Sequence, residues 1–170
     1  MPKTTFDREA LIKAAEEMLS KERRPAREIL AKKEVNLKEK YFVGGDFSYI
    51  PIYNTNFSGS WLQKASFKNA VLEKVKFIGA DLSEADFTEA TFKDVDFTDA
   101  NLYKTKFNSI RIEGEFKIWK AKNPREIVAD EAGFREIIDH LKLQAQEEPD
   151  ETERNRIEEL CNFYEKQLKG

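Results

Sequence analysis

The side chains best suited to catalysis or metal binding are few. His140 is the only histidine and Cys161 is the only cysteine, which is too few for the usual Cys/His zinc site. A nucleophile–histidine pair would require His140 to meet Cys161. However, Cys161 falls on the apolar stripe of a predicted helix, and His140 is expected to be a solvated or edge residue of another helix. The sequence therefore predicts neither a zinc centre nor a nucleophilic site.

Motifs that bind cofactors are also missing from the sequence. Neither a G-x-x-x-x-G-K-[ST] loop nor a G-x-G-x-x-G turn occurs. The Gly44-Gly45 pair is too short for a phosphate loop and is better explained as a corner of the chain. Carboxylates are abundant, but a filled repeat core leaves no cleft in which a pair of them could act on a substrate. We therefore predict a protein that is not an enzyme and that needs no cofactor.

Several of the carboxylates lie in a repeat of period five, and this repeat must position them. A large apolar residue stands at every fifth position from Phe42 to Ile112, and from Ala65 on a smaller residue precedes each of them by two. Neither a helix nor a strand has this period. A chain that points one large residue inward every five residues must turn a corner each time. Four corners close a square coil of about twenty residues, and stacked coils pair like parallel strands about 4.8 Å apart.

The period of twenty predicts which residues lie above one another. Two inward columns consist of phenylalanine, and the other two are mainly aliphatic. The phenylalanine columns are Phe47/Phe67/Phe87/Phe107 and Phe57/Phe77/Phe97. Outward positions alternate in charge, and the expected inter-coil pairs are Lys64–Glu84, Lys74–Asp94, Lys76–Asp96 and Lys106–Asp86. Each such pair contributes roughly 0.2–1 kcal/mol.

Consecutive copies of the repeat read ADLSE (80–84), ADFTE (85–89), ATFKD (90–94), VDFTD (95–99) and ANLYK (100–104). They resemble the pentapeptide repeat family. The resemblance implies a β fold, a right-handed quadrilateral β-helix of about four coils. We expect three parts: a helical N-terminal cap (1–41), the β-helix (42–112) and a C-terminal plug with a helical hairpin (113–170).

The resemblance raises one specific alternative for function. Family members of the quinolone-resistance type bind DNA gyrase as acidic rods that resemble duplex DNA. The matching acidic surface here is Asp81, Glu84, Asp86, Glu89, Asp94, Asp96 and Asp99. Lysine-bearing coils flank it, and the rod of roughly 18 Å matches only about ten phosphates. DNA mimicry is therefore the second hypothesis for this chain.

Outward-facing aromatic residues indicate the first hypothesis. Tyr41 and Trp61 are twenty residues apart and should stack, with Gln63 and Tyr103 on the same face. Tryptophan and tyrosine are favoured as interface anchors, so we predict a protein-interaction module or scaffold whose partner is an unknown protein. Alternatively, an N-terminal helix covers Trp61 with Leu11 and Met18.

Both ends of the chain are expected to be helical. A first helix should begin near Phe6, and a second could run from Pro25 to about Lys33. Beyond the repeat, Phe116, Ile118 and Trp119 should plug the last coil. Asn123-Pro124 followed by Glu126 indicates a helix start. The resulting hairpin either caps the rod or pairs with a second copy, so a homodimer is possible.

Composition limits the remaining function classes. The charged fraction is 36% with a formal net charge of -3, so acid and base are interleaved and bulk nucleic-acid binding is not expected. The charged N-terminus lacks the apolar region of a signal peptide. No apolar run is long enough for a transmembrane helix. We expect a cytoplasmic protein.

Overall fold

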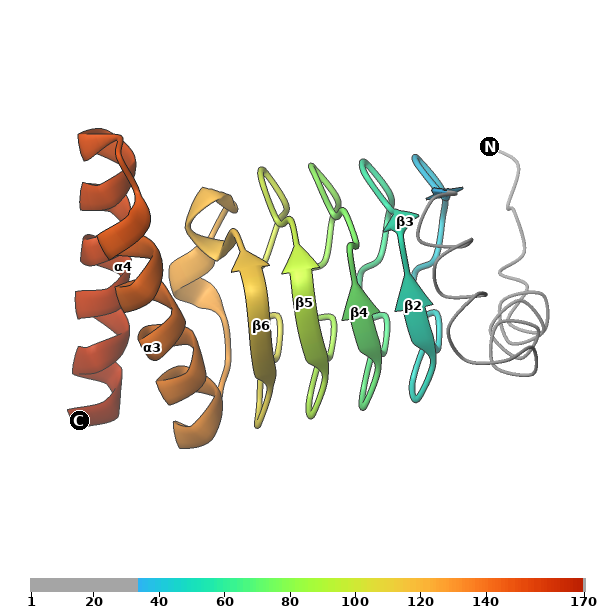
Figure 1. The fold of residues 1–170 in the computed structure, drawn as a ribbon. Coiled ribbons are helices and arrows are strands. Elements are labelled where there is room, and N and C mark those ends of the chain that lie inside the picture. Colours follow the sequence, from blue (N-terminus) through green and yellow to red (C-terminus); the bar gives the residue numbers. More distant parts are fainter. Residues whose placement is uncertain (1–33, 170) are drawn as a thin grey trace, which may run out of the picture.

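The computed structural model describes residues 34–169. They form a β-solenoid over residues 35–116, followed by two helices at its C-terminal end (Figure 1). The helices predicted between Phe6 and Lys33 lie outside the described residues. Within residues 34–169, neither helix is long and apolar enough to cross a membrane.

The coils stack in the predicted register of twenty residues. One strand from each of four coils enters a parallel four-stranded sheet in the order β2-β4-β5-β6, and β1 pairs with β3. Pro51 lies opposite Val71, and Val71 lies opposite Thr91. The strands are β1 (Val35–Asn36), β2 (Pro51–Tyr53), β3 (Thr55–Asn56), β4 (Val71–Glu73), β5 (Thr91–Val95) and β6 (Arg111–Phe116). The period inferred from the sequence is therefore confirmed.

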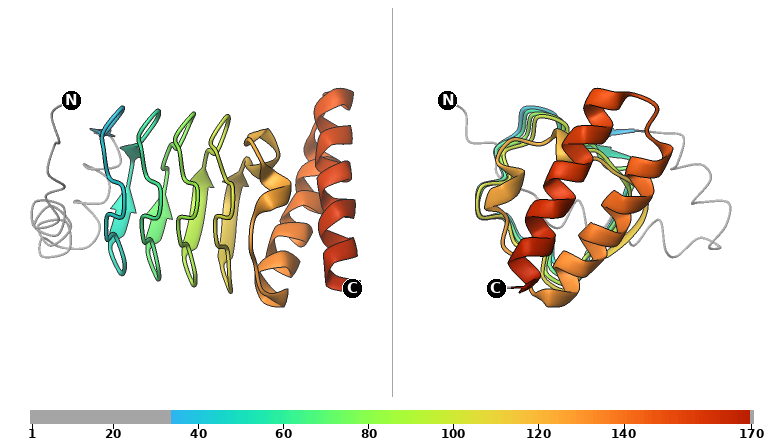
Figure 2. Two further views of the ribbon diagram at one scale, coloured as in Figure 1. Left: turned by 180° about the vertical axis from the view of Figure 1, so that it is seen from behind. Right: turned by 90° about the vertical axis from the view of Figure 1, so that its left-hand side faces the viewer.

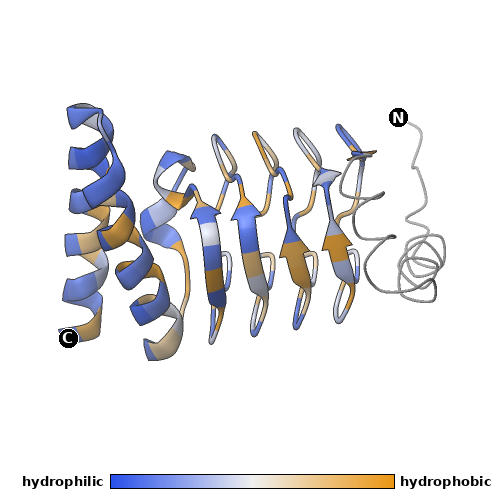
Figure 3. Ribbon diagram, in the orientation of Figure 1, coloured by the Kyte–Doolittle hydropathy of each residue, from blue (hydrophilic) through white to orange (hydrophobic). Residues whose placement is uncertain are grey.

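The two phenylalanine columns fill the interior of the solenoid. Along one column, the Phe67 and Phe87 ring centroids are 4.8 Å apart with nearly parallel planes. Between columns the rings meet edge to face, as Phe77 and Phe87 do at 5.9 Å. All these side chains are fully buried, and hydrophobic and hydrophilic residues alternate around the coils (Figure 3). Offset stacking and edge-to-face packing are the favoured aromatic arrangements, so the columns contribute strongly to the stability of the solenoid.

Each corner of the coil uses a left-handed backbone residue, which the sequence reasoning did not anticipate. Every fifth residue from Glu39 to Gly114 has a positive φ of 45–71°, although few of these residues are glycine. A left-handed conformation costs roughly 1–2 kcal/mol at a residue other than glycine. Hydrogen bonds between coils offset this cost; at one corner, the Glu84 amide donates to the Tyr103 carbonyl over 2.8 Å.

The solenoid begins earlier than predicted. Val35 lies opposite Thr55 in parallel pairing, and the Leu37 amide donates to the Asn56 carbonyl over 2.8 Å. Leu37 is partly buried against the core. It stands five residues before Phe42 and so continues the series of inward apolar residues. Assigning residues 35–41 to a helical cap was therefore wrong, because the repeat pattern extends one apolar position further.

Beyond the last strand the chain makes an irregular coil before the helices begin. A register shift moves Phe116 opposite Val95, and two 3-10 turns follow, η1 (Ile118–Lys120) and η2 (Pro124–Glu126). The predicted helix start at Asn123 is wrong, since Asn123 is left-handed (φ 55°) and only one 3-10 turn follows it. This segment still pairs with the solenoid, with Lys122 opposite Asn101 and Val128 opposite Lys106. Pairing with the coil therefore competes successfully with the local helix signal.

The helical hairpin covers the open end of this last coil (Figures 1 and 2). Its helices are α3 (Glu131–Glu147) and α4 (Glu151–Lys169). The Arg154 guanidinium donates to the Glu148 carbonyl at 2.7 Å, which satisfies the end of α3. The buried Tyr164 hydroxyl donates to the Pro124 carbonyl. The apolar stripes of both helices are thereby buried, at Ile137, Ile138, Leu141, Ile157, Leu160 and Tyr164.

Candidate interaction surface

Trp61 and Tyr41 form a stacked pair on one side of the solenoid. They lie opposite each other in neighbouring coils, and their ring centroids are 4.3 Å apart with an interplanar angle of 5°. The Trp61 side chain remains 36% exposed. Its own backbone is paired with the preceding coil, because the Trp61 amide donates to the Lys40 carbonyl over 2.9 Å and the Trp61 carbonyl accepts from the Phe42 amide over 2.7 Å. The predicted stacking is therefore confirmed, and it lies where backbone hydrogen bonds join the two coils.

A ladder of polar side chains continues the same column beyond Trp61. The Gln63 Nε2 donates to Asp81 Oδ2 at 2.8 Å, and the Asn101 Nδ2 donates to Asp81 Oδ1 at 3.1 Å. The Asn123 Nδ2 in turn donates to Asn101 Oδ1 at 2.9 Å. Amide and carboxylate groups thus bridge successive coils and hold the side of the rod that carries Trp61.

Two further apolar side chains are exposed on this side. Tyr103 is 41% exposed, and the Lys104 ammonium lies 5.2 Å from its ring centroid. Val43 is 59% exposed, and the sequence reasoning did not predict it as part of this surface. Its position sixty residues before Tyr103, which equals three coils of twenty residues, would have placed it in the same column. We call Tyr41, Val43, Trp61, Gln63 and Tyr103 together the Trp61 face.

The acidic residue Asp86 is held within the solenoid by its neighbours. Its Oδ1 accepts from the Thr88 amide at 3.0 Å and from the Thr88 hydroxyl at 2.6 Å. Lys68 and Lys106 lie 3.3 and 3.8 Å from its Oδ2. Partial burial favours a higher pKa, but the Thr88 hydrogen bonds and Lys68 outweigh it and lower the pKa of Asp86. This carboxylate is therefore engaged in hydrogen bonds and ion pairs within the solenoid and is not part of an open acidic surface.

Several of the other acidic residues have similar local roles. The Asp81 and Asp96 carboxylates accept from the backbone amides of Ser83 and Thr98, two residues further on. This Asx turn explains why Asp or Asn recurs beside the inward residue of the repeat. Asp94 Oδ1 accepts from the Glu115 amide at 3.1 Å, so it bonds the next coil.

The acidic residues that are most exposed stand at separate corners. Glu84, Glu89 and Asp99 are exposed and occupy three different left-handed corner positions of the coil. Glu84 is also 3.9 Å from the Lys64 ammonium. The exposed carboxylates therefore do not line up along one side of the rod.

The predicted inter-coil ion pairs form only in part. Lys64–Glu84 at 3.9 Å and Lys106–Asp86 at 3.8 Å are confirmed. Within residues 34–169, Lys74–Asp94 and Lys76–Asp96 do not form ion pairs. Lys76 lies instead 3.7 Å from Glu34, and Asp96 lies 3.7 Å from Lys117. Stacking at the predicted register brings these side chains near one another, but rotamers and local hydrogen bonds decide which contacts form.

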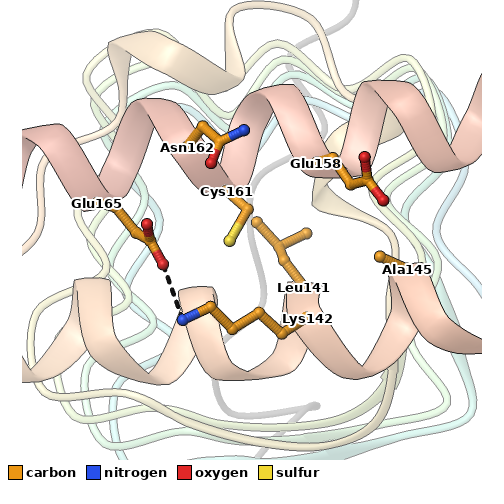
Figure 4. Close-up of a pocket in the computed structure, with 7 residues that line it drawn as sticks. All are labelled: Leu141, Lys142, Ala145, Glu158, Cys161, Asn162 and Glu165. Atoms are coloured by element: carbon orange, nitrogen blue, oxygen red, sulfur yellow. Dashed lines mark ion pairs between the residues drawn. The ribbon is translucent and has the colours of Figure 1, made fainter.

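His140 and Cys161, the two residues considered for nucleophilic chemistry, are packed against neighbouring side chains. The His140 ring meets the Phe116 ring edge to face at 6.0 Å, and burial lowers the pKa of His140. Burial raises the pKa of the Cys161 thiol. Cys161 borders a groove of about 280 Å³ between α3 and α4, together with Leu141, Lys142, Ala145, Glu158, Asn162 and Glu165 (Figure 4). His140 is not among the residues that line this groove. Within residues 34–169 no cluster of side chains suits a metal ion.

Asp130 joins the hairpin to the solenoid. Its Oδ1 accepts from the Gly133 amide at 2.7 Å, as an N-cap of α3, and from the Ser109 amide at 2.8 Å. Its Oδ2 accepts from the Ser109 hydroxyl at 2.5 Å. Desolvation alone would raise the pKa of Asp130, but these hydrogen bonds lower it. The carboxylate thus stabilises both the first turn of α3 and the corner of the solenoid at Ser109.

Replacing Asp130 by alanine is expected to destabilise the docked hairpin by about 1–2 kcal/mol, the usual loss for an N-cap. Because the pKa of Asp130 is lowered in the folded protein, its contribution is complete above the pKa of the unfolded chain. The contribution disappears as the pH falls through the folded pKa. Urea unfolding of wild type and Asp130→Ala should therefore differ at pH 7 and converge at strongly acidic pH.

Asp150 provides the matched control for this prediction. It caps α4 through the Glu153 amide at 2.9 Å, at an exposed site between the two helices. Asp150→Ala should lose the cap energy of α4 while the Ser109 corner stays protected from hydrogen exchange. If Asp130→Ala leaves exchange at Ser109 unchanged, the proposed link between hairpin and solenoid is wrong.

Comparison with known proteins identifies the repeat. The family model described as pentapeptide repeats matches residues 53–88 and 76–114. No curated protein sequence matches the chain. Among solved structures, HetL, a regulator of heterocyst differentiation in the cyanobacterium Nostoc sp. strain PCC 7120, is 30% identical with a TM-score of 0.40. That match covers 50% of this chain and 40% of HetL, so the chain spans less than half of HetL.

Two further solved structures have lower identity. Another pentapeptide repeat protein from Nostoc PCC 7120 is 22% identical over 58% of this chain and 82% of its own, with a TM-score of 0.48. QnrB1, a plasmid-mediated fluoroquinolone resistance protein, is 18% identical over 64% of this chain and 56% of its own, with a TM-score of 0.34. The repeat pattern, the coil register and the family match agree, and the chain belongs to the pentapeptide repeat family through its β-solenoid.

Proposed function

We propose that the protein is a non-enzymatic protein-interaction module that binds a partner protein through the Trp61 face. The observation that supports this proposal most directly is Trp61, which stacks on Tyr41 and is itself 36% exposed. Tryptophan and tyrosine often dominate the binding energy of interfaces. A rigid support reduces the ordering cost that a partner must overcome on association.

The backbone of this face restricts how a partner can bind. Part of it is already paired between coils, as in the bonds from the Phe42 amide to the Trp61 carbonyl at 2.7 Å and from the Leu62 amide to the Asp81 carbonyl at 2.8 Å. These bonds between coils leave few backbone groups on this side for an added strand. We therefore expect the partner to contact side chains, and Trp61, Tyr103 and Val43 provide the exposed apolar ones.

Replacing Trp61 by alanine is expected to abolish capture of the partner from an extract of the native cell, because the central apolar anchor is lost. The matched control is Ile78→Ala. Ile78 is 37% exposed, compared with 36% for Trp61, but lies on another side of the coil. Both variants should keep the far-ultraviolet circular dichroism of the wild type. Equal capture by wild type and Trp61→Ala would reject the Trp61 face as the binding site.

DNA mimicry is less well supported as a function. The acidic residues that would have to imitate phosphates either serve the coil, as Asp86 does, or stand at separate corners, as Glu84, Glu89 and Asp99 do. A gyrase supercoiling assay distinguishes the two functions. Inhibition of supercoiling, or protection of gyrase from a quinolone, would favour mimicry over the proposed module.

A further inference from the structure

His140 is a titratable group at the junction between the helical hairpin and the solenoid. It lies on α3, and its ring meets the Phe116 ring of β6 edge to face at 6.0 Å. Its Nε2 atom is buried and has no hydrogen-bond partner within residues 34–169. Phe116 is fully buried and meets Phe97 and Phe107 edge to face at the end of the phenylalanine columns. A change of charge at His140 therefore acts directly on the contact between α3 and the last coil.

The neutral form of His140 suits this site better than the protonated form. An imidazolium carries an N–H group on both ring nitrogens, so protonation places a donor at Nε2 that no described group accepts. A buried donor without a partner costs free energy, and a charged one costs more. Burial accordingly lowers the pKa of His140, although the Glu136 and Glu147 carboxylates favour the protonated form.

The charged groups around His140 come from α3 and β6. Glu136 and Glu147, both on α3, are the carboxylates that act on its charge. On β6 and just beyond it, Glu115 and Lys117 flank the phenylalanine that faces the imidazole ring, and they pair with each other at 3.0 Å. The negative charge that favours protonation is therefore supplied by α3 itself, and β6 presents an apolar ring to His140.

The helix α4 adds two titratable groups on the other side of α3. The Tyr164 ring packs against Phe134 of α3 at 5.4 Å, and Cys161 borders the groove between the two helices. Burial raises the pKa of both groups, so both stay neutral at neutral and acidic pH. Carboxylates ordinarily titrate near pH 4. Because His140 is the only histidine, it is the side chain expected to titrate between about pH 7.5 and 5.5.

Hydrogen bonds near His140 hold α3 on the solenoid. The Ile112 amide donates to Glu136 Oε1 at 2.7 Å, about one helical turn before His140. At the start of α3, Asp130 accepts from the Ser109 amide at 2.8 Å. Units of a repeat protein contact only their neighbours, so a terminal unit can open while the other coils stay folded. The Ile112 amide therefore reports whether α3 is in place.

We propose that His140 is an acid-sensitive latch on the hairpin: protonation of its ring loosens α3 from the last coil while the solenoid stays folded. The pKa of His140 is lower in the folded protein than its ordinary value of 6.5. The stability contributed by the neutral ring is therefore complete above that ordinary value and is lost as the pH falls through the folded pKa. A loosened hairpin uncovers Phe116 and the backbone at Ile112. The latch is independent of the Trp61 face and of the proposed function.

Two NMR measurements on the full-length chain between about pH 7.5 and 5.5 test the latch. The ring protons of the single histidine give its pKa, which should lie below 6.5. Amide exchange at Ile112, divided by the rate of an unstructured peptide at the same pH, should rise several-fold as the pH falls. It should also exceed exchange at Leu82, whose amide donates to the Asn101 carbonyl at 3.0 Å within the solenoid.

Three variants assign the acid response to the buried ring. His140→Gln and His140→Leu remove the titratable group and keep a side chain at the site, so exchange at Ile112 should lose its rise with acid in both. The matched control is Asp139→His combined with His140→Gln, which moves the single histidine to the neighbouring exposed position. The moved histidine should titrate near its ordinary pKa and should leave exchange at Ile112 independent of pH in this range.

Several results would overturn the latch. A pKa of 6.5 or more for His140 in the wild type would show that the folded protein does not favour the neutral ring. Exchange at Ile112 that ignores pH, or that rises equally in His140→Gln, would remove the coupling to α3. Equal protection of Ile112 and Leu82 at both pH values would show that the hairpin does not open separately from the solenoid.

Discussion

Replacing Phe87 by alanine is expected to destabilise the protein by about 3–5 kcal/mol, the usual loss for a buried phenylalanine. Phe87 is fully buried and stacks between Phe67 at 4.8 Å and Phe107 at 5.4 Å. It also meets the second column edge to face, at Phe77 and Phe97. The cavity would therefore interrupt both columns in the middle of the rod, where neighbouring coils depend on one another.

Urea unfolding followed by circular dichroism measures this loss. Phe87→Leu is the matched variant, because leucine already fills the neighbouring column at Leu82 and Leu102. It should lose clearly less stability than Phe87→Ala, since most of the apolar volume is kept. A loss of less than about 1 kcal/mol for Phe87→Ala, typical of an average substitution, would contradict a core built on stacked rings.

Replacing Gly133 by alanine is expected to destabilise the docked hairpin by about 1–3 kcal/mol, the range for forced overpacking. A Cβ on Gly133 would lie 2.0 Å from the Phe107 carbonyl oxygen. That oxygen belongs to the backbone of the last coil and cannot rotate away, so α3 would have to move. In an ordinary helix the same substitution stabilises by about 1 kcal/mol. Close packing of α3 on the solenoid therefore reverses the sign.

Hydrogen exchange at Ile112 reports the position of α3, because the Ile112 amide donates to Glu136 Oε1 at 2.7 Å. Gly133→Ala should expose this amide and lower the urea midpoint. The neighbouring exposed residue provides the control: Ala132→Gly should cost about 1 kcal/mol through helix propensity while Ile112 stays protected. A Gly133→Ala protein more stable than the wild type would show that α3 does not approach Phe107 so closely.

The role of Gly133 illustrates what local sequence signals miss. A glycine inside a helix ordinarily only weakens the helix, and Asn123-Pro124 followed by Glu126 is a local signal for a helix start. The structure reverses both readings, because residues 117–130 pair with the last coil and α3 can begin only where that pairing ends. Such choices depend on contacts between segments far apart in the sequence, and no local propensity contains them.

For the candidate surface, the sequence predicted which residues stack but not which charged side chains pair. The register of twenty placed Tyr41 on Trp61 and aligned Gln63 with Tyr103, because each position in a coil has a fixed direction. It did not predict which charged neighbours would pair, since a long side chain can reach several partners. Asp94 and Asp96 illustrate this point, as they bond Glu115 and Lys117 in place of the lysines below them.

The period-five pattern by itself determined the β-solenoid, its register and its phenylalanine core, because a repeat has one way to bury an apolar residue at every fifth position. Only the tertiary structure decided where the solenoid begins and ends, how α3 seats on Phe107, and which carboxylates are engaged within the coil. These features depend on backbone pairing and packing distances of a few ångströms, which residue type and spacing do not specify.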